Sequence, residues 1–269
     1  MRIGDVDSLA THGTSALHAA APAAKLVAFA LILAAVVVGN NVLVLLAILL
    51  VLTTLAAGTG LPLRRMLPLA AYSGVLAAFF AFAIAPGWLG AALIIGKAIT
   101  AAFAAVTLLF TTPYPFVFAP IQRFLPVILG DALFMTYRSL FLMIDRFDQV
   151  LTAARLRAGL VGANPLRSAG VVTRSLGGML LYSVDLSQRT YDVMRLRGYD
   201  GRLSVHIPRS QRPVLSGALI LGALAIFAAS VAWRLSWHRL NPYSWLPVLA
   251  AFIALTIVAA LAGIRKARA

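Results

Sequence analysis

The stretch YDVMRLRGYDGR, Tyr191–Arg202, closes an arginine-rich segment that lies between two blocks of almost purely apolar sequence. This segment, residues 113–212, holds 13 of the 23 basic residues of the chain. It is too polar to span lipid and too rich in apolar residues to be a disordered linker. We therefore expect a folded, basic, helical insert between membrane helices, built to contact something in the cytoplasm.

The composition predicts an all-α integral membrane protein. Hydrophobic residues make up 61% of the 269 residues, charged residues only 12%, and the mean hydropathy is +0.93, whereas soluble domains average about 45–50% apolar and about 25% charged residues. The net charge is +15, which in a membrane protein points first to cytoplasmic orientation, lipid head groups and an acidic protein partner rather than nucleic acid. The absence of cysteine excludes disulfides, thiolate metal sites and cysteine nucleophiles.

Six apolar segments meet, or nearly meet, the requirement of about 20 residues for a helix that crosses a bilayer. Turn residues such as Gly39-Asn40-Asn41 and Pro86-Gly87 separate them. The chain thus divides into N-terminal membrane helices (residues 1–112), the insert (113–212) and C-terminal membrane helices (213–269). The predicted spans are Ala23–Val38, Val42–Ala57, Met66–Ala85, Leu89–Thr111, Val214–Trp233 and Trp245–Gly263.

The basic residues that flank the spans predict the orientation. With six spans, the Arg64-Arg65 pair, the insert and the basic C-terminal tail fall on the same side of the membrane, which should be the cytoplasm of the cell. Both termini are then cytoplasmic. Arg234 and Arg239 form an exception on the far side, which would vanish if the last two spans were one re-entrant pair.

Two long amphipathic helices are expected within the insert. The first runs from about Asp131, a plausible N-cap, to Arg157 before the stop at Gly159. The second begins with Asn164 as cap and Pro165 at its first position, and ends at Gly198. Apolar or small residues recur at steps of three and four along both helices. The seam residues are Leu133, Tyr137, Leu140, Ile144, Phe147 and Leu151 in the first helix and Val172, Leu176, Met179, Ser183, Leu186, Thr190 and Val193 in the second.

Both helix ends combine arginine with a glycine. Arg155 and Arg157 precede Gly159, and Arg195 and Arg197 precede Gly198. Arginine near a helix C-terminus often only satisfies carbonyls and the helix dipole. Two matching ends on adjacent helices favour a further role, because the five-donor guanidinium suits a carboxylate-lined groove on a partner.

Several stretches resemble the transmembrane coupling component, the T component, of energy-coupling factor (ECF) transporters. The resemblance covers roughly Leu17 to Arg202 and is most specific in Met194–Arg202. The stretches are Leu17–Leu26, similar to the usual proline-lysine beginning of the first span, Thr111–Pro115, Tyr137–Phe141 and Met194–Arg202.

The resemblance implies partners and site residues. In this family, each of two coupling helices ends in an arginine-containing triplet that docks into a groove on one of two ATP-binding subunits. The matching positions are Leu196-Arg197-Gly198 and, at the first site, Arg157-Ala158, with Arg155 as the alternative contact. Ala158 separates arginine from Gly159, which is more similar to the cobalt-type branch, CbiQ, than to the vitamin-type branch.

The resemblance also implies a mechanism. ATP-driven closure of the two ATPases would shift the coupling helices, which would reshape a separate substrate-binding membrane subunit, for cobalt or nickel or, alternatively, a vitamin. ATP and magnesium would be bound by the ATPases, and no cofactor is expected in this chain.

Catalytic and metal-binding motifs are missing from the sequence. Gly90–Ala98 does not fit a P-loop, because it has one residue too many between its glycines and alanine after Lys97. The four histidines, at positions 12, 18, 206 and 238, are scattered, so a metal site or an intramembrane enzyme is not favoured over a coupling subunit. A membrane scaffold without transport function stays an alternative. Lys97, the one clearly intramembrane charge, either snorkels to the interface or contacts a partner.

Overall fold

The computed structural model describes Thr11, Gly13, Ser15 and residues 17–85, 87–122, 125–156, 165–199, 201, 213–236 and 241–267. Every regular element in this part of the chain is a helix, as the sequence predicts. The residues form two compact units, which we call the membrane unit (Met1–Val117 with Pro208–Ala269) and the insert unit (Phe118–Ile207).

The membrane unit contains a helix at each of the six predicted spans. Asn41 caps its helix by accepting a hydrogen bond at Oδ1 from the amide of Leu43, at 2.9 Å, and Gly60 and Gly87 have φ values of 77° and 135° at the two following turns. The helices are α2 (Pro22–Val38), α3 (Val42–Gly58), α4 (Leu63–Ile84), α5 (Trp88–Thr111), α9 (Pro213–Leu235) and α11 (Trp245–Ala267), with the short η1 (Asn241–Tyr243) before α11.

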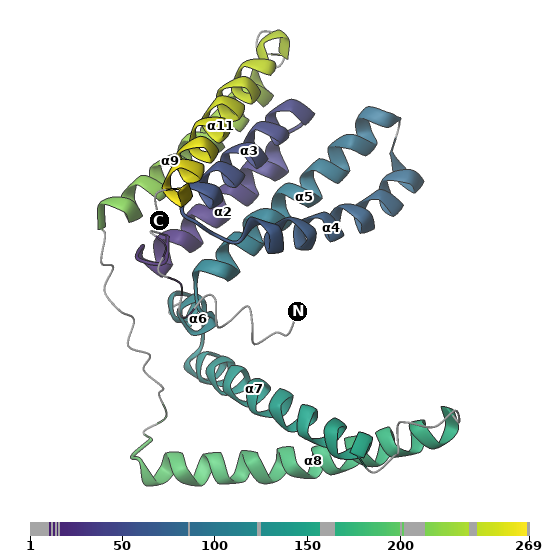
Figure 1. Cartoon of the computed structure of the whole chain (residues 1–269). Coiled ribbons are helices and arrows are strands. Elements are labelled where there is room, and N and C mark those ends of the chain that lie inside the picture. The colour runs from purple at the N-terminus through teal and green to yellow at the C-terminus, as the bar shows by residue number, and fades with distance from the viewer. Residues whose placement is uncertain are drawn as a thin grey trace. The chain divides into compact units, whose positions relative to one another are not determined.

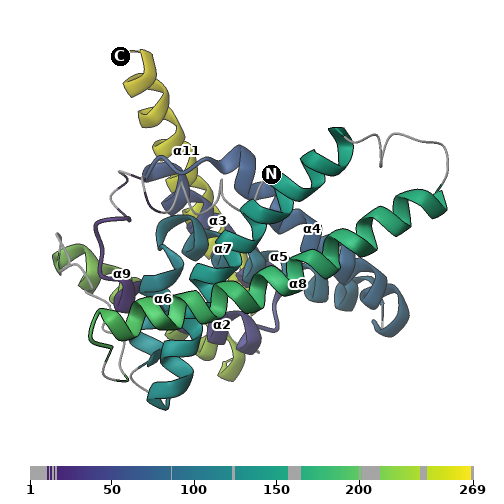
Figure 2. The ribbon, with the colours of Figure 1, turned by 90° about the horizontal axis from the view of Figure 1, so that it is seen from below.

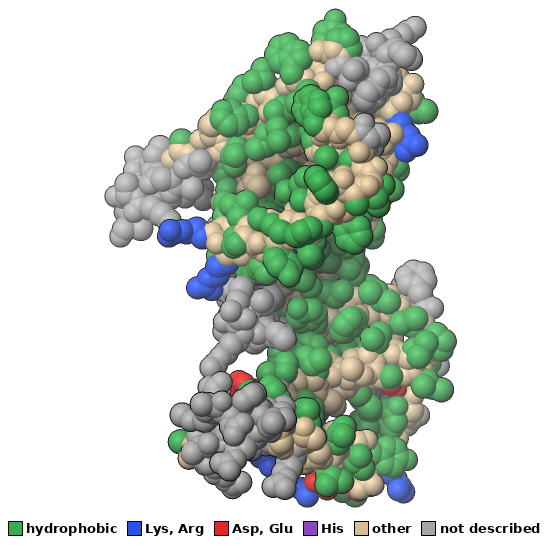
Figure 3. All heavy atoms as spheres, turned by 90° about the vertical axis from the view of Figure 1, so that its right-hand side faces the viewer, with side chains coloured by type: hydrophobic (Ala, Val, Ile, Leu, Met, Phe, Trp, Pro, Cys, Tyr) green, Lys and Arg blue, Asp and Glu red, His purple; other side chains and the backbone are tan. Residues whose placement is uncertain are grey.

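The helices of the membrane unit pack as neighbours that are not always adjacent in sequence. Helix α2 packs on α9, and α3 on α11, while α4 and α5 form a hairpin, and Figure 1 shows α2, α3, α9 and α11 running side by side. The core includes Met66 and Phe103, both fully buried, and Phe110. On the face drawn in Figure 3, hydrophobic side chains cover most of this unit and basic side chains show only at its margins, as expected of a surface in lipid.

Gly74 permits the close crossing of α4 on α5. A Cβ atom at this position would lie 2.7 Å from Cγ1 and 2.8 Å from Cδ1 of Ile99. We expect Gly74→Val to destabilise the fold by about 1–3 kcal/mol through overpacking, measured as a lower thermal unfolding midpoint in detergent. Gly217→Val is the matched control, because nothing lies within 4 Å of a Cβ at that position. Equal midpoints for the two variants would contradict this account of the crossing.

The insert unit contains two long helices, α7 (Val127–Leu156) and α8 (Pro165–Leu196), preceded by the short α6 (Tyr114–Gln122), which begins in the membrane unit. Figure 2 shows α7 and α8 from below. Aromatic side chains connect α6 to α7, since the ring of Phe118 lies 6.5 Å from those of Phe134 and Tyr137 in edge-to-face geometry.

The structure corrects one predicted helix boundary and agrees with another. Helix α7 begins at Val127, directly after Pro126, so Asp131 lies inside the helix and is not its N-cap. Helix α8 begins with Pro165 at its first position, as predicted. Asn164 and the stop at Gly159 lie outside the described residues.

The prediction that the insert is too polar to span lipid is wrong for α7. By length and composition, its portion Val127–Ala153 is long and apolar enough to cross a membrane, as are α4, α5 and α9. Helices α2 and α3 are apolar but have only 17 residues each. The average over residues 113–212 concealed this difference, because only two of the 13 basic residues of the insert, Arg138 and Arg146, lie between Val127 and Ala153, beside three aspartates.

Candidate functional site

Of the two predicted helix tips, the structure describes one. Helix α7 ends at Leu156, so Arg157, Ala158 and Gly159 lie outside the described residues. Arg155 belongs to the last turn of α7, but its side chain is also outside the described part of the chain. The geometry of the site can therefore be built only from the tip of α8.

The tip of α8 is a Schellman motif centred on Gly198. The amide of Tyr199 donates to the carbonyl of Met194 at 3.0 Å, and the amide of Gly198 donates to that of Arg195 at 3.1 Å. Gly198 has a φ of 79°, in the left-handed region that other residues adopt only at a cost. The prediction that Gly198 ends this helix is confirmed.

The side chains of this tip point outward. Leu196 is 88% exposed, and Arg195 and Arg197 are exposed as well. The guanidinium of Arg195 lies over the ring of Tyr191, 6.0 Å from its centre. An apolar side chain and an arginine thus stand next to each other on a rigid helix end, which suits a groove with apolar walls and carboxylate oxygens.

A buried polar cluster fixes the chain immediately after the tip. The hydroxyl of Tyr199 donates to Oδ2 of Asp131 at 2.7 Å, and the amide nitrogen of Gln122 donates to Oδ1 at 3.3 Å. Asp131 is only 4% exposed. The end of α8 is therefore tied to the second turn of α7 and to α6 by bonds that are strengthened by burial. Tyr199 and Asp131 are 68 positions apart in the sequence, and no local pattern indicates that they form a hydrogen bond.

The predicted seam residues are only partly covered within the insert unit. Leu133, Tyr137 and Ile144 in α7 and Met179, Ser183 and Leu186 in α8 are partly buried, whereas Leu140 and Leu176 are 46% and 48% exposed. Met179 of α8 shares a shallow hollow with Leu140, Ile144 and Phe147 of α7. The crossing is reinforced by the guanidinium of Arg146, which lies 4.9 Å from the ring centre of Tyr182.

An ion pair lies along the exposed surface of α8. Asp185 and Arg189 form a salt bridge of 3.0 Å, one helical turn apart. Arg146 instead bonds Gln149 and lies over Tyr182. Asp145, Asp148 and Asp192 make no ion pair with any residue that the structure describes, so these three carboxylates differ from that of Asp185.

Lys97 satisfies the end of a neighbouring helix. Its ammonium donates to the carbonyl of Val37, in the last turn of α2, at 2.9 Å. Arg234 of α9 reaches the adjacent carbonyl of Val38 at 3.4 Å. Cations are favoured at helix C-termini, where the last carbonyls lack partners within the helix. These contacts give Arg234, the exception to the predicted charge distribution, a structural role.

A second lysine, overlooked in the sequence, caps another helix. Lys25 is only 7% exposed, and its ammonium donates to the carbonyl of Thr111 at 2.9 Å, at the end of α5. The position of Lys25 in the first turn of an apolar helix could have predicted this contact, because the ammonium of a buried lysine must bind carbonyl oxygens. Lys97 is therefore not the only intramembrane cation.

His18 makes structural contacts, in line with the reading of scattered histidines. Its Nε2 lies 3.1 Å from the carbonyl oxygen of Phe110, and its Nδ1 lies 2.7 Å from the hydroxyl of Ser15. The other three histidines are outside the described residues. No group of three or more potential metal-ligating side chains occurs among the residues that the structure covers.

Comparison with known proteins identifies the family. The family model described as CbiQ, cobalt transport protein, matches residues 13–207, the larger part of the chain, from the segment before α2 to beyond the tip of α8. No curated protein matches the chain. The chain therefore belongs to the CbiQ cobalt transport family, the transmembrane components of energy-coupling factor transporters.

Proposed function

We propose that this chain is the coupling subunit of an ECF-type importer for cobalt or nickel. It would transmit the ATP-driven motion of two ATPase subunits to a separate membrane subunit that binds the substrate. The observation that carries the proposal is the tip of α8, where a Schellman motif holds Leu196 and Arg197 exposed at the end of a helix of 32 residues.

The tip is suited to transmit force as well as to bind. A helix of 32 residues is about 48 Å long at a rise of 1.5 Å per residue. Arg197 would occupy a carboxylate-lined groove on one ATPase, and Arg157 or Arg155 a groove on the other. Because Tyr199 is bonded to Asp131 at 2.7 Å, displacement of the α8 tip would also pull on α7. The resulting motion would be a sliding of packed helices.

ATP and magnesium would bind to the ATPase partners, and this chain would hydrolyse nothing. The basic ends of α7 and α8, together with Arg64 and Arg65 in the first turn of α4, would face the cytoplasm, as would both termini of the chain. The complex would lie in the inner or plasma membrane of the cell. The insertion depth of α7 would be decided by its partners, since its exposed apolar residues suit lipid or another membrane subunit.

Purification of the chain from its native membrane is expected to bring with it two ATP-binding subunits and a further membrane protein. The physical reason is that the exposed apolar and basic surface of the insert unit requires partners to cover it. Mild detergent extraction followed by identification of the bound proteins by mass spectrometry measures this. A stable preparation that contains no ATP-binding subunit would contradict the transporter proposal and favour a scaffold.

A further inference from the structure

The chain passes between its two units at two junctions. It leaves the membrane unit within α6, after Val117, and returns at Pro208, before α9. The end of α5, which leads into α6, and the beginning of α9 are therefore the ends of the long membrane-unit helices that the chain joins to the insert unit. We call residues Leu17–Lys25 the N-terminal clasp, because they bond both of these helix ends.

The clasp bonds the end of α5 through two side chains. His18 contacts the carbonyl oxygen of Phe110 at 3.1 Å, and Lys25 donates to that of Thr111 at 2.9 Å. The Lys25 ammonium also lies 3.5 Å from the carbonyl oxygen of His18, so the first and last parts of the clasp are in contact. Phe110 and Thr111 are 2% and 3% exposed, so these carbonyls have little access to water, and the loss of a donor would leave a buried acceptor unsatisfied.

The same clasp bonds the beginning of α9. The amide of Ala21, one of the unsatisfied donors at the start of α2, donates to the hydroxyl oxygen of Ser216 at 2.9 Å. Ser216 is 8% exposed and lies in the first turn of α9, and Leu17 and Ala20 of the clasp are buried as well. A segment near the N-terminus thus connects two helix ends that are separated in sequence by the whole insert unit.

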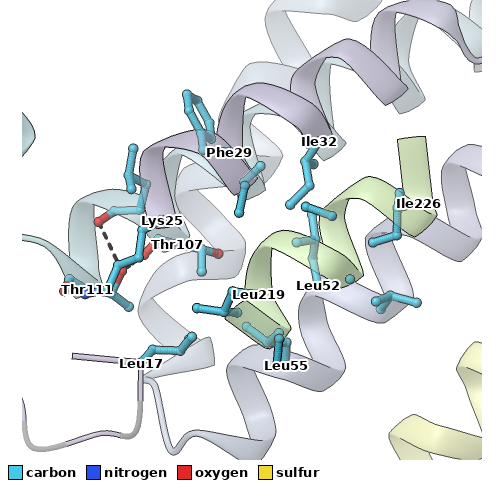
Figure 4. A pocket seen from close by; sticks show the side chains of 17 residues that line it. Leu17, Lys25, Phe29, Ile32, Leu52, Leu55, Thr107, Thr111, Leu219 and Ile226 are labelled. Carbon is cyan, nitrogen blue, oxygen red and sulfur yellow. Dashed lines mark hydrogen bonds between the residues drawn. The ribbon is translucent and has the colours of Figure 1, made fainter. Parts of the chain in front are cut away.

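Next to the N-terminal clasp, the helices of the membrane unit leave a space between them. A largely apolar cavity of about 160 Å³ lies between α2, α3, α5 and α9, and its lining includes Lys25, Thr111, Leu52 and Leu219. Figure 4 shows Lys25, Thr107 and Thr111 together at one end of this space, where the ammonium of Lys25 donates to the carbonyl of Thr111. Side chains that face a void lose dispersion contacts, so the polar bonds of the clasp add to the packing of α2 on α5 and on α9 in fixing the spacing of the helices at this end.

We propose that Lys25 and Ser216 are positioning residues that hold the end of α5 and the start of α9 at a fixed distance. Movement of the insert unit is then passed to the helices of the membrane unit instead of separating the two junctions. The inference rests on the proposed coupling function. It adds two residues of the membrane unit, Lys25 and Ser216, to that function.

The test combines a distance measurement with transport. The chain contains no cysteine, so cysteines introduced at Leu109 in α5 and Val214 in α9 can carry a pair of spin labels. Pulsed electron paramagnetic resonance on the complex with its ATPase and substrate-binding partners then reports the distance between the junctions. Cobalt uptake and ATP hydrolysis are measured on the same variants, without labels, in proteoliposomes.

Lys25→Met and Ser216→Ala are expected to broaden the distance distribution and to lower ATP-driven uptake, by about tenfold for Lys25→Met because a hydrogen bond from a charged group is lost. ATP hydrolysis should persist. Lys25→Arg, which keeps a cationic donor, should restore part of the uptake. Lys97→Met is the matched control, since it also removes a lysine bond to a helix-end carbonyl, at 2.9 Å from Val37, but at the end of α2.

The proposal would be overturned by an unchanged distance distribution in both variants, or by a broadened distribution with normal uptake. An equal loss of uptake in Lys97→Met would overturn it too, because the effect would then be a general one on the fold. Failure of the proposed function would look different, since the unmodified complex would then show no ATP-dependent uptake, whatever the distance between the labels.

Discussion

Replacement of both Arg157 and Arg197 by alanine is expected to abolish ATP-driven cobalt uptake while leaving membrane insertion intact. Each arginine would leave a carboxylate unpaired in its groove on an ATPase, at a cost of about 2–5 kcal/mol if the groove is buried. Removal of both would detach the two ATPases from the coupling helices. Uptake of cobalt into proteoliposomes and co-purification of the ATPases measure the two parts of this result.

Arg189→Ala is the control for this pair. Arg189 also lies on α8 and is exposed, but its salt bridge to Asp185 joins two residues of one helix, 76% and 49% exposed, and such pairs are worth little. Single changes at positions 155 and 157 decide which arginine is the primary contact of the first tip. Normal uptake in the double variant would refute the docking role.

Tyr199→Phe is expected to lower uptake about tenfold, as loss of a hydrogen bond to a charged group predicts. The change removes only the hydroxyl, which donates to the buried Asp131 at 2.7 Å. The Schellman motif, formed by backbone groups, would remain, but the α8 tip would lose its bond to α7. ATP hydrolysis by the complex should be retained, which separates loss of coupling from loss of assembly.

Tyr191→Phe serves as the matched control. Tyr191 is in the last turns of the same helix and 53% exposed, and its ring, which lies 6.0 Å from the guanidinium of Arg195, is kept in the variant. Asp131→Ala should lower uptake at least as much, because it removes the bonds from both Tyr199 and Gln122, and the addition of Tyr199→Phe to Asp131→Ala should have little further effect, because the bond between them is already lost. Additive losses would show that the two residues act independently.

Local features of the fold were predictable from the sequence, because their causes are local. Pro165 begins α8 and Gly198 ends it, since the proline ring fixes φ and glycine alone adopts the left-handed cap without strain. The six apolar segments of the membrane unit are each a helix, because a helix satisfies the backbone hydrogen bonds of an apolar segment within that segment. The start of α7 was missed by five residues, because Asp131 was taken for the N-cap although the helix begins directly after Pro126.

Contacts between distant residues were not predictable. Lys25 meets Thr111 across 86 positions, and Tyr199 meets Asp131 across 68, and no periodicity within either segment encodes the partner. A single sequence therefore indicated the exposed arginines of the α8 tip but not the polar bonds that fix it in place. The polarity of α7 was misjudged for another reason, since it was averaged with the arginine-rich remainder of the insert.

The cations of the membrane unit have a consequence for the path of the transported ion. Lys25, Lys97 and Arg234 are each bonded to helix-end carbonyls, and no aspartate or glutamate occurs in residues 8–130 or 201–269. A divalent cation that moved along these helices would meet fixed positive charge and no carboxylate to replace its water shell. These helices thus present an electrostatic barrier to a divalent cation such as the cobalt ion that names the family, and the ion is expected to cross the membrane along a neighbouring subunit.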